Sequence, residues 1–148
     1  MIWKPNVTVA AVIEEHGRFL LVEEDTDDGK AFNQPAGHLE ENESVLEGVV
    51  RETLEETAYH FKPEYLLGIY RWHHAGKNIT FLRFAFAGRA TGFEAQRKLD
   101  HGIIRTVWQS VDEIRASQSR HRSPLVLRCV QDYLAGKRYP LDIITYYK

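Results

Sequence analysis

Hydrophobic runs at the start of the chain alternate with short polar stretches. Residues 7–13 are almost entirely apolar and rich in β-branched side chains, which is typical of a buried strand. A turn over residues 14–17 allows residues 18–23 to return as its hairpin partner. The polar stretch 25–30 is expected to be a loop, and residues 32–38, where proline and glycine lie close together, are expected to be irregular.

The central part of the chain has the pattern of a helix followed by strands. A helix is predicted from about Glu43 to Thr57, with Asn42 as its N-terminal cap. Three strand-like runs and a short helix follow it, and they cover residues 65–72, 79–87, 103–108 and 112–117.

A second long helix is expected near the end of the chain. Ser123 should cap it, Pro124 suits its first position, and it should end at about residues 135–136. Because helices and strands are intermixed, and neither a linker nor an internal repeat interrupts them, the prediction is one domain over residues 1–148 of the α/β (α+β) class.

The composition is that of an ordinary globular protein, with 43% hydrophobic and 27% charged residues in 148. The single cysteine, Cys129, excludes an internal disulfide, and its apolar neighbours indicate a buried thiol. The N-terminus does not have the pattern of a signal peptide, and no apolar run has membrane-spanning length. A cytoplasmic location, with no membrane partner, is therefore expected.

The net charge of -2 conceals an uneven distribution. Residues 14–56 contain fourteen acidic and three basic residues, whereas residues 57–148 contain seven acidic and fifteen basic ones. Two such halves could meet around a cation and an anion together. They could equally form two differently solvated surfaces, and composition alone does not separate these readings.

Three glutamates mark the candidate chemistry. At about 100° per residue, Glu52, Glu55 and Glu56 share one face of the predicted helix. Carboxylates this close repel one another, and a hard divalent cation such as Mg²⁺ offsets that repulsion because it prefers oxygen ligands. Helix spacing alone also allows a solvated acidic face.

Neighbouring residues favour the metal site. Arg51 lies eight residues after Glu43 and is expected to brace the helix start without competing for the metal. Gly37 lies just before the helix, where its carbonyl could approach the same ion. Gly48 lies one turn below Glu52, where the missing side chain is expected to leave space for a ligand.

This segment resembles the Nudix box, G-x5-E-x7-R-E-U-x-E-E-x-G-U, in which U is aliphatic. The matching residues are Gly37, Glu43, Arg51, Glu52, Glu55 and Glu56. Thr53 occupies an aliphatic position, Tyr59 another, and Ala58 replaces the closing glycine. Thr53 resembles valine in shape, and Ala58 suggests that the helix exit needs no left-handed glycine. Shorter stretches elsewhere are similar to bacterial NudJ-type phosphatases of that family.

The resemblance implies an α/β/α sandwich with a mixed sheet, in which the box forms a loop-helix-loop. It also implies that Glu52, Glu55 and Glu56 bind Mg²⁺ or Mn²⁺ with help from the Gly37 carbonyl. The implied activity is hydrolysis of phosphoanhydride bonds in nucleoside tri- or diphosphates, or in pyrimidine or thiamine pyrophosphates. Glu52 or Glu56 could act as the general base. A carboxylate from a distant loop is the other option, and Glu94 and Asp100 are the candidates there.

Substrate contacts are expected from the basic half of the chain. Arg83 and Arg122 are the candidate anion binders, and the N-terminus of the last helix is suited to an anion as well. Trp72 or Tyr70 could form an aromatic wall for a flat ring. His38 follows Gly37 and is expected to line the site. His73 and His74 are set aside as metal ligands, because adjacent histidines do not have zinc-site spacing.

Three alternatives remain open. The first is a pyrophosphohydrolase for substrates like ADP-ribose or dinucleotides, and the second is a nucleotide-sensing module that has lost catalysis. The third is nucleic-acid binding, which the near-neutral net charge and the lack of a dense basic cluster disfavour. The expected partner is a small nucleotide or pyrophosphate, and the chain is expected to be a monomer or a homodimer.

Overall fold

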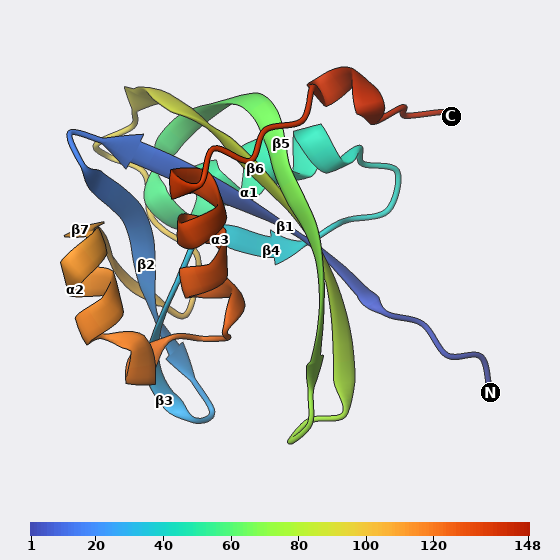
Figure 1. Ribbon diagram of the computed structural model, residues 1–148, viewed down its shortest axis with the longest axis horizontal. Coiled ribbons are helices and arrows are strands. Elements are labelled where there is room, and N and C mark those ends of the chain that lie inside the picture. The colour runs from blue at the N-terminus through green and yellow to red at the C-terminus, as the bar shows by residue number, and fades with distance from the viewer.

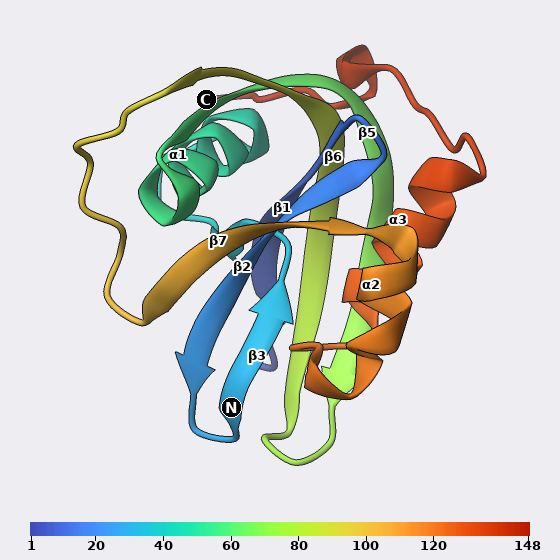
Figure 2. The ribbon, with the colours of Figure 1, turned by 90° about the vertical axis from the view of Figure 1, so that its left-hand side faces the viewer.

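Seven strands form the centre of the protein and three helices cover them. The computed structural model describes residues 1–148. Its strands are β1 (Asn6–Glu15), β2 (Arg18–Thr26), β3 (Gly29–Asn33), β4 (Ala36–His38), β5 (Tyr59–His74), β6 (Ile79–Phe93) and β7 (Ile103–Ser110). Its α-helices are α1 (Val45–Thr57), α2 (Val111–Ala116) and α3 (Leu125–Leu134) (Figure 1). Figure 2 shows the strands between α1 on one side and α2 and α3 on the other.

The central strand β1 links two groups of strands. It runs parallel to β6 and antiparallel to β4, and β6 continues into β5 as a long antiparallel hairpin. At its far end β1 turns into β2, which pairs with both β3 and β7. The sheet is therefore mixed, and the predicted fold class is confirmed.

β1 is apolar throughout because both of its faces are covered. Ala10 and Val12 belong to a core that includes Cys129 and Val130 of α3. Residues 9, 11 and 13 point to the opposite core, which includes Val49 of α1. A strand buried on both faces has no polar side, and this explains the uninterrupted hydrophobic run. Cys129 is fully buried, as its apolar neighbours predicted.

The loop predicted over residues 25–30 is a tight hairpin. β2 continues to Thr26, β3 begins at Gly29, and these two residues pair across the turn. The Thr26 hydroxyl donates a hydrogen bond of 2.6 Å to the Gly29 carbonyl. The polar residues there belong to the exposed ends of two strands, so polarity alone did not distinguish a loop from a hairpin. The segment predicted to be irregular contains the end of β3 and all of β4.

The start of α1 also differs from the prediction. Its cap is Ser44, whose side chain accepts from the Glu47 N–H while the Glu47 side chain accepts from the Ser44 N–H. This reciprocal pair is a capping box. Asn42 lies outside the helix with φ of 64°. At the other end, Ala58 adopts the left-handed conformation with φ of 64°, so the expectation that the helix exit avoids it was wrong.

The remaining elements follow the predicted order with longer strands. β5 and β6 extend beyond their predicted limits, and α3 begins one residue after Pro124. The Ser123 hydroxyl accepts from the Leu125 N–H at 3.1 Å, although the cap position itself belongs to Pro124. The C-terminal segment pairs Tyr139 with Leu66 on β5. No α-helix combines the length and hydropathy that crossing a membrane requires.

Candidate active site

Helix α1 is anchored to the sheet by one face and presents its glutamates on another. Val49, Thr53 and Thr57 are buried against the strands. The Thr53 hydroxyl donates to the Val49 carbonyl at 2.7 Å, and the Thr57 hydroxyl donates to the Thr53 carbonyl at 2.6 Å. Each buried hydroxyl therefore has a partner, which explains how threonine fills an aliphatic position without an unsatisfied polar group.

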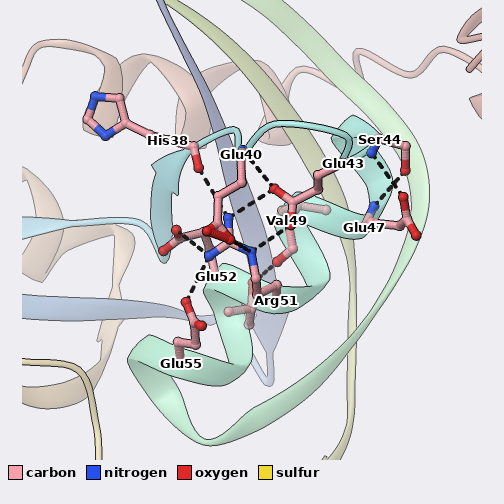
Figure 3. Close-up of polar contacts among 10 residues, drawn as sticks. His38, Glu40, Glu43, Ser44, Glu47, Val49, Arg51, Glu52 and Glu55 are labelled. Atoms are coloured by element: carbon pink, nitrogen blue, oxygen red, sulfur yellow. Dashed lines mark hydrogen bonds and ion pairs between the residues drawn. The ribbon is translucent and has the colours of Figure 1, made fainter. Parts of the chain in front are cut away.

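Arg51 lies at the centre of a group of carboxylates (Figure 3). Its Nε donates to Glu43 at 2.6 Å, and that hydrogen bond lowers the pKa of Glu43. Its Nη1 donates to both Glu52 and Glu55 at 2.8 Å. Arg51 thus contacts two of the proposed metal ligands as well as Glu43. The expectation that it braces the helix without competing for them was wrong.

Two glycines give side chains room at this site. A Cβ on Gly37 would overlap the carboxylate of Glu52, so only glycine allows β4 to approach α1 this closely. A Cβ on Gly48 would lie 2.9 Å from a carboxylate oxygen of Glu43. The space at Gly48 is therefore occupied by Glu43, and the expectation that a ligand uses it was wrong.

A loop carboxylate joins the helix glutamates. The side-chain oxygens of Glu52, Glu55 and Asp100 lie within 4.8 Å of one another. The Asp100 N–H donates to the Glu55 carbonyl at 3.0 Å, which fixes the loop against α1. Burial raises the pKa of Asp100, and the nearby Glu55 adds to this effect. The other loop candidate, Glu94, instead contacts His60 at 2.6 Å.

Glu56 lies outside this cluster of three carboxylates, lines a cleft together with Glu52 and is 8% exposed. One of its oxygens accepts from the Ala36 N–H at 2.9 Å, and it has no salt bridge. Burial raises the pKa of Glu56 to about 9, and the charges of Glu24, Glu52 and Asp100 contribute to this shift. Burial also raises the pKa of Glu52, although the hydrogen bond from Arg51 opposes it. Crowded oxygen donors of this kind fit a divalent cation.

Glu56 faces a cleft of about 600 Å³. The cleft is lined by both acidic and basic residues. Of the residues predicted from sequence, the lining includes Gly37, His38, Glu52, Glu56, Trp72, Arg83 and Arg122. Glu55 is not in the lining and takes part only in the cluster with Asp100.

Sequence reasoning missed several residues of the cleft. They are Glu24, His74, Lys77 and Arg120, together with Asn33 on β3. Glu24 is buried and contacts Arg122 at 2.6 Å, while Arg120 contacts the adjacent Glu23. No local signal marks Glu24 or Arg120, because their partners lie 98 and 97 residues away in the sequence.

Arg83 has a different environment from the other bases of the cleft. It is 5% exposed and is the only lysine or arginine among the buried residues. It donates to the side-chain oxygens of Asn33 and Gln34, both at 2.9 Å, and has no carboxylate partner. A buried guanidinium without a counter-charge is costly. An anion in the cleft would offset that cost.

The aromatic wall of the cleft is formed by Trp72. Its ring stacks on Phe81, with ring centroids 5.8 Å apart and an interplanar angle of 16°. Tyr70 was the other candidate, but it does not line the cleft. Its hydroxyl donates to Asp132 at 2.7 Å, and its ring packs against the core. In Figure 3 the His38 carbonyl faces Arg51 while the ring points away from it.

Comparison with known proteins identifies the family. The model of the NUDIX domain matches residues 3–129. The chain belongs to the Nudix family. It is 42% identical to Phosphatase NudJ of Escherichia coli (strain K12) over 143 residues, which cover 96% of this chain and 92% of that protein. As a Nudix protein with such relatives, it is a hydrolase of phosphorus-containing acid anhydrides.

Solved structures of Nudix proteins agree with this assignment. A NUDIX hydrolase from Nitrosomonas europaea is 56% identical, with a TM-score of 0.95 over 97% of this chain and 98% of that one. A MutT NUDIX hydrolase from Burkholderia pseudomallei has a TM-score of 0.75 at 18% identity, over 88% and 98% of the two chains, and so shows the fold alone. Nudix hydrolases generally use divalent metals, and the carboxylate cluster is compatible with one.

Proposed function

We propose that this Nudix hydrolase uses Mg²⁺ to release phosphate from small nucleoside tri- or diphosphates, or from pyrimidine or thiamine pyrophosphates. The observation that carries the proposal is a pair of buried ionisable side chains in one cleft. Glu56 and Arg83 are both buried, line the same cleft and lack a partner of opposite charge. The other buried acids, Glu23, Glu24 and Asp132, each have an arginine partner.

A buried carboxyl group without a cationic partner and a buried guanidinium without an anionic partner can each be completed by a ligand of opposite sign. A cation near Glu56 and an anion near Arg83 would each offset a desolvation cost that the protein alone leaves unmet. A metal and a phosphate chain supply this combination together. The acidic first half of the chain provides Glu56, and the basic second half provides Arg83.

The residues proposed to hold the metal are Glu52, Glu55 and Glu56, with the Gly37 carbonyl. Their donors are all oxygen atoms, which favours Mg²⁺, with Mn²⁺ as an alternative. Once bound, such an ion neutralises phosphate oxygens and lowers the pKa of an attacking water. Asp100 is the distant-loop carboxylate that reaches this cluster, which makes it a better candidate than Glu94 for assisting the reaction.

The other side of the cleft is proposed to bind the substrate. Arg83 and Arg122 would contact its anionic groups, and the Trp72 ring would stack on a flat base or pyrimidine. His38 lines the same cleft near Gly37. The printed name of the Escherichia coli relatives, a phosphatase, supports the release of orthophosphate.

A substrate screen tests the proposal. The purified protein would be incubated with nucleoside di- and triphosphates, thiamine pyrophosphate and ADP-ribose, with Mg²⁺ and with excess chelator. Orthophosphate, pyrophosphate and nucleoside monophosphate would be measured separately. We expect Mg²⁺-dependent orthophosphate from at least one di- or triphosphate. Hydrolysis of ADP-ribose alone, or equal rates with chelator, would contradict the proposal.

A further inference from the structure

Arg83 differs from the other arginines of the cleft in what accepts its hydrogen bonds. Arg122 contacts the buried Glu24, and Arg120 shares the buried Glu23 with Arg105, so both have a carboxylate partner within the protein. The acceptors that hold Arg83 are the uncharged amide oxygens of Asn33 and Gln34, with the Cys129 sulfur at 3.8 Å as a weaker third. An amide oxygen satisfies a donor but leaves the positive charge of the guanidinium intact.

The two amides are themselves held in place. Gln34 is 1% exposed, and its Nε2 donates to the Val126 carbonyl of α3 at 2.8 Å. With its nitrogen fixed on a carbonyl, its oxygen must face Arg83. Asn33 is 8% exposed and lies at the end of β3, where it pairs with Val22. The guanidinium is therefore held by Gln34 and Cys129 at Nη1 and by Asn33 at Nη2, and the side chain lines the cleft.

We propose that Asn33 and Gln34 are positioning residues that fix the Arg83 guanidinium without neutralising it, so that its whole charge serves an anionic phosphate or phosphonate group in the cleft. This inference rests on the proposed function for the identity of the substrate. It adds which residues hold Arg83 in place and why its charge stays available to the substrate. It also makes Arg83 a stronger anion binder than Arg122, whose charge Glu24 already matches.

Asn33→Asp separates this role from a purely structural one. The new carboxylate keeps the shape and the acceptor oxygen at 2.9 Å, but gives Arg83 a counter-charge. A structural role predicts that the substitution is tolerated, because the contact with Arg83 becomes a charge-assisted pair. The proposed role predicts that the folded protein loses affinity for anions. Asn33→Ala makes the converse change, because it removes the contact and leaves the charge.

The probe is methylenediphosphonate, in which a CH₂ group replaces the bridging oxygen of pyrophosphate and prevents hydrolysis. Its affinity would be measured by calorimetry in the presence of Mg²⁺, alongside KM, kcat and thermal unfolding. We expect Asn33→Asp to weaken binding by about 10- to 100-fold, the value of a hydrogen bond to a charged group. KM should rise by a similar factor, with a smaller change in kcat and no decrease in Tm.

Asn33→Ala should weaken binding less than Asn33→Asp and should lower Tm. Asn78→Asp is the matched control, since it adds the same charge at an exposed turn of the β5–β6 hairpin. It should change the affinity by no more than about twofold, because exposed charges are largely screened. Affinity in Asn33→Asp that equals the wild type, or exceeds that of Asn33→Ala, would overturn the inference.

A second variant and a comparison of binding with hydrolysis complete the test. If Asn33→Asp does not fold, Arg83→Met removes the charge with a side chain of similar length, and it must lose affinity by at least about tenfold. Binding of the diphosphonate does not require turnover. A wild type that hydrolyses nothing would therefore refute the proposed function, whereas normal hydrolysis with unchanged binding in Asn33→Asp would refute only the inference.

Discussion

Replacing Glu56 with glutamine should stabilise the metal-free protein while abolishing most of its activity. Glutamine keeps the size of the side chain and an oxygen that can accept from the Ala36 N–H. It removes the carboxyl group that has to take up a proton when the protein folds at neutral pH. Because burial raises the pKa of Glu56 to about 9 from 4.5, the folded protein binds a proton at neutral pH that the unfolded chain releases.

The sign and size of the effect follow from this linkage. The destabilisation is absent below about pH 4.5, where both states are protonated, and grows as the pH rises until it levels off near 9. At pH 7 the side chain lies about 2.5 pH units above its unfolded pKa, which corresponds to roughly 3 kcal/mol at 1.36 kcal/mol per unit. Glu56→Gln should recover most of this, a rise in Tm on the order of 6–12 °C.

The assay is thermal unfolding at pH 5 and pH 7.5, with and without Mg²⁺. The advantage of Glu56→Gln should be large at pH 7.5 and small at pH 5. Mg²⁺ should stabilise the wild type more than the variant, because the cation favours the ionised carboxylate. Turnover should fall by about 100-fold or more, since metal stabilisation of the transition state is worth several kcal/mol.

Glu47→Gln is the matched control. Glu47 is an exposed residue of the same helix, and glutamine can replace glutamate in the capping box. Its stability should change by less than about 0.5 kcal/mol. A variant Glu56→Gln that is no more stable than the wild type at pH 7.5 would show that folding does not raise the pKa of Glu56. Near-normal turnover would remove Glu56 from the proposed metal site.

Two other substitutions test the geometry around this carboxylate. In Gly37→Ala, the new Cβ would displace the Glu52 carboxylate, so a titration of activity with Mg²⁺ should show a lower affinity for Mg²⁺. The free energy of unfolding should fall by only about 1–3 kcal/mol relative to the wild type. An unchanged Mg²⁺ titration would contradict the close contact. Asp100→Asn should weaken Mg²⁺-dependent activity by about 10- to 100-fold, as expected for a group that supports a metal site. Glu94→Gln, outside the cluster, should change it by less than twofold, and equal effects of both would argue against a special role for Asp100.

The features that sequence predicted well depend on local periodicity. The apolar run of β1 and the i, i+3 and i+4 spacing of Glu52, Glu55 and Glu56 are visible in a short window. The fold class followed, because a doubly buried strand and an amphipathic helix permit few arrangements. The capping box Ser44-x-x-Glu47 is present in the sequence but was not predicted, because Asn42 was chosen as the cap; its signal is the stronger one, since both side chains must match.

The features that sequence did not predict depend on distant partners. Arg51 was expected to contact Glu43, but its guanidinium also reaches Glu52 and Glu55, because one fork can serve several carboxylates around it. Glu24 gave no signal, since its partner Arg122 is 98 residues away. Gly48 was read as open space because helix geometry does not show that Glu43 folds back over it.

The functional conclusion depends on which buried ionisable side chains have a partner of opposite charge and which do not. Composition gave an acidic half and a basic half, and two buried acids of the first half, Glu23 and Glu24, pair with arginines of the second. Had Glu56 and Arg83 also paired, the cleft would be stable but would have little affinity for ions. Because they remain unpaired, the free energy of unfolding is lower than it would be with a pair, and binding of a cation and an anion can raise it again. The loss is therefore a source of affinity for a metal and a phosphate together.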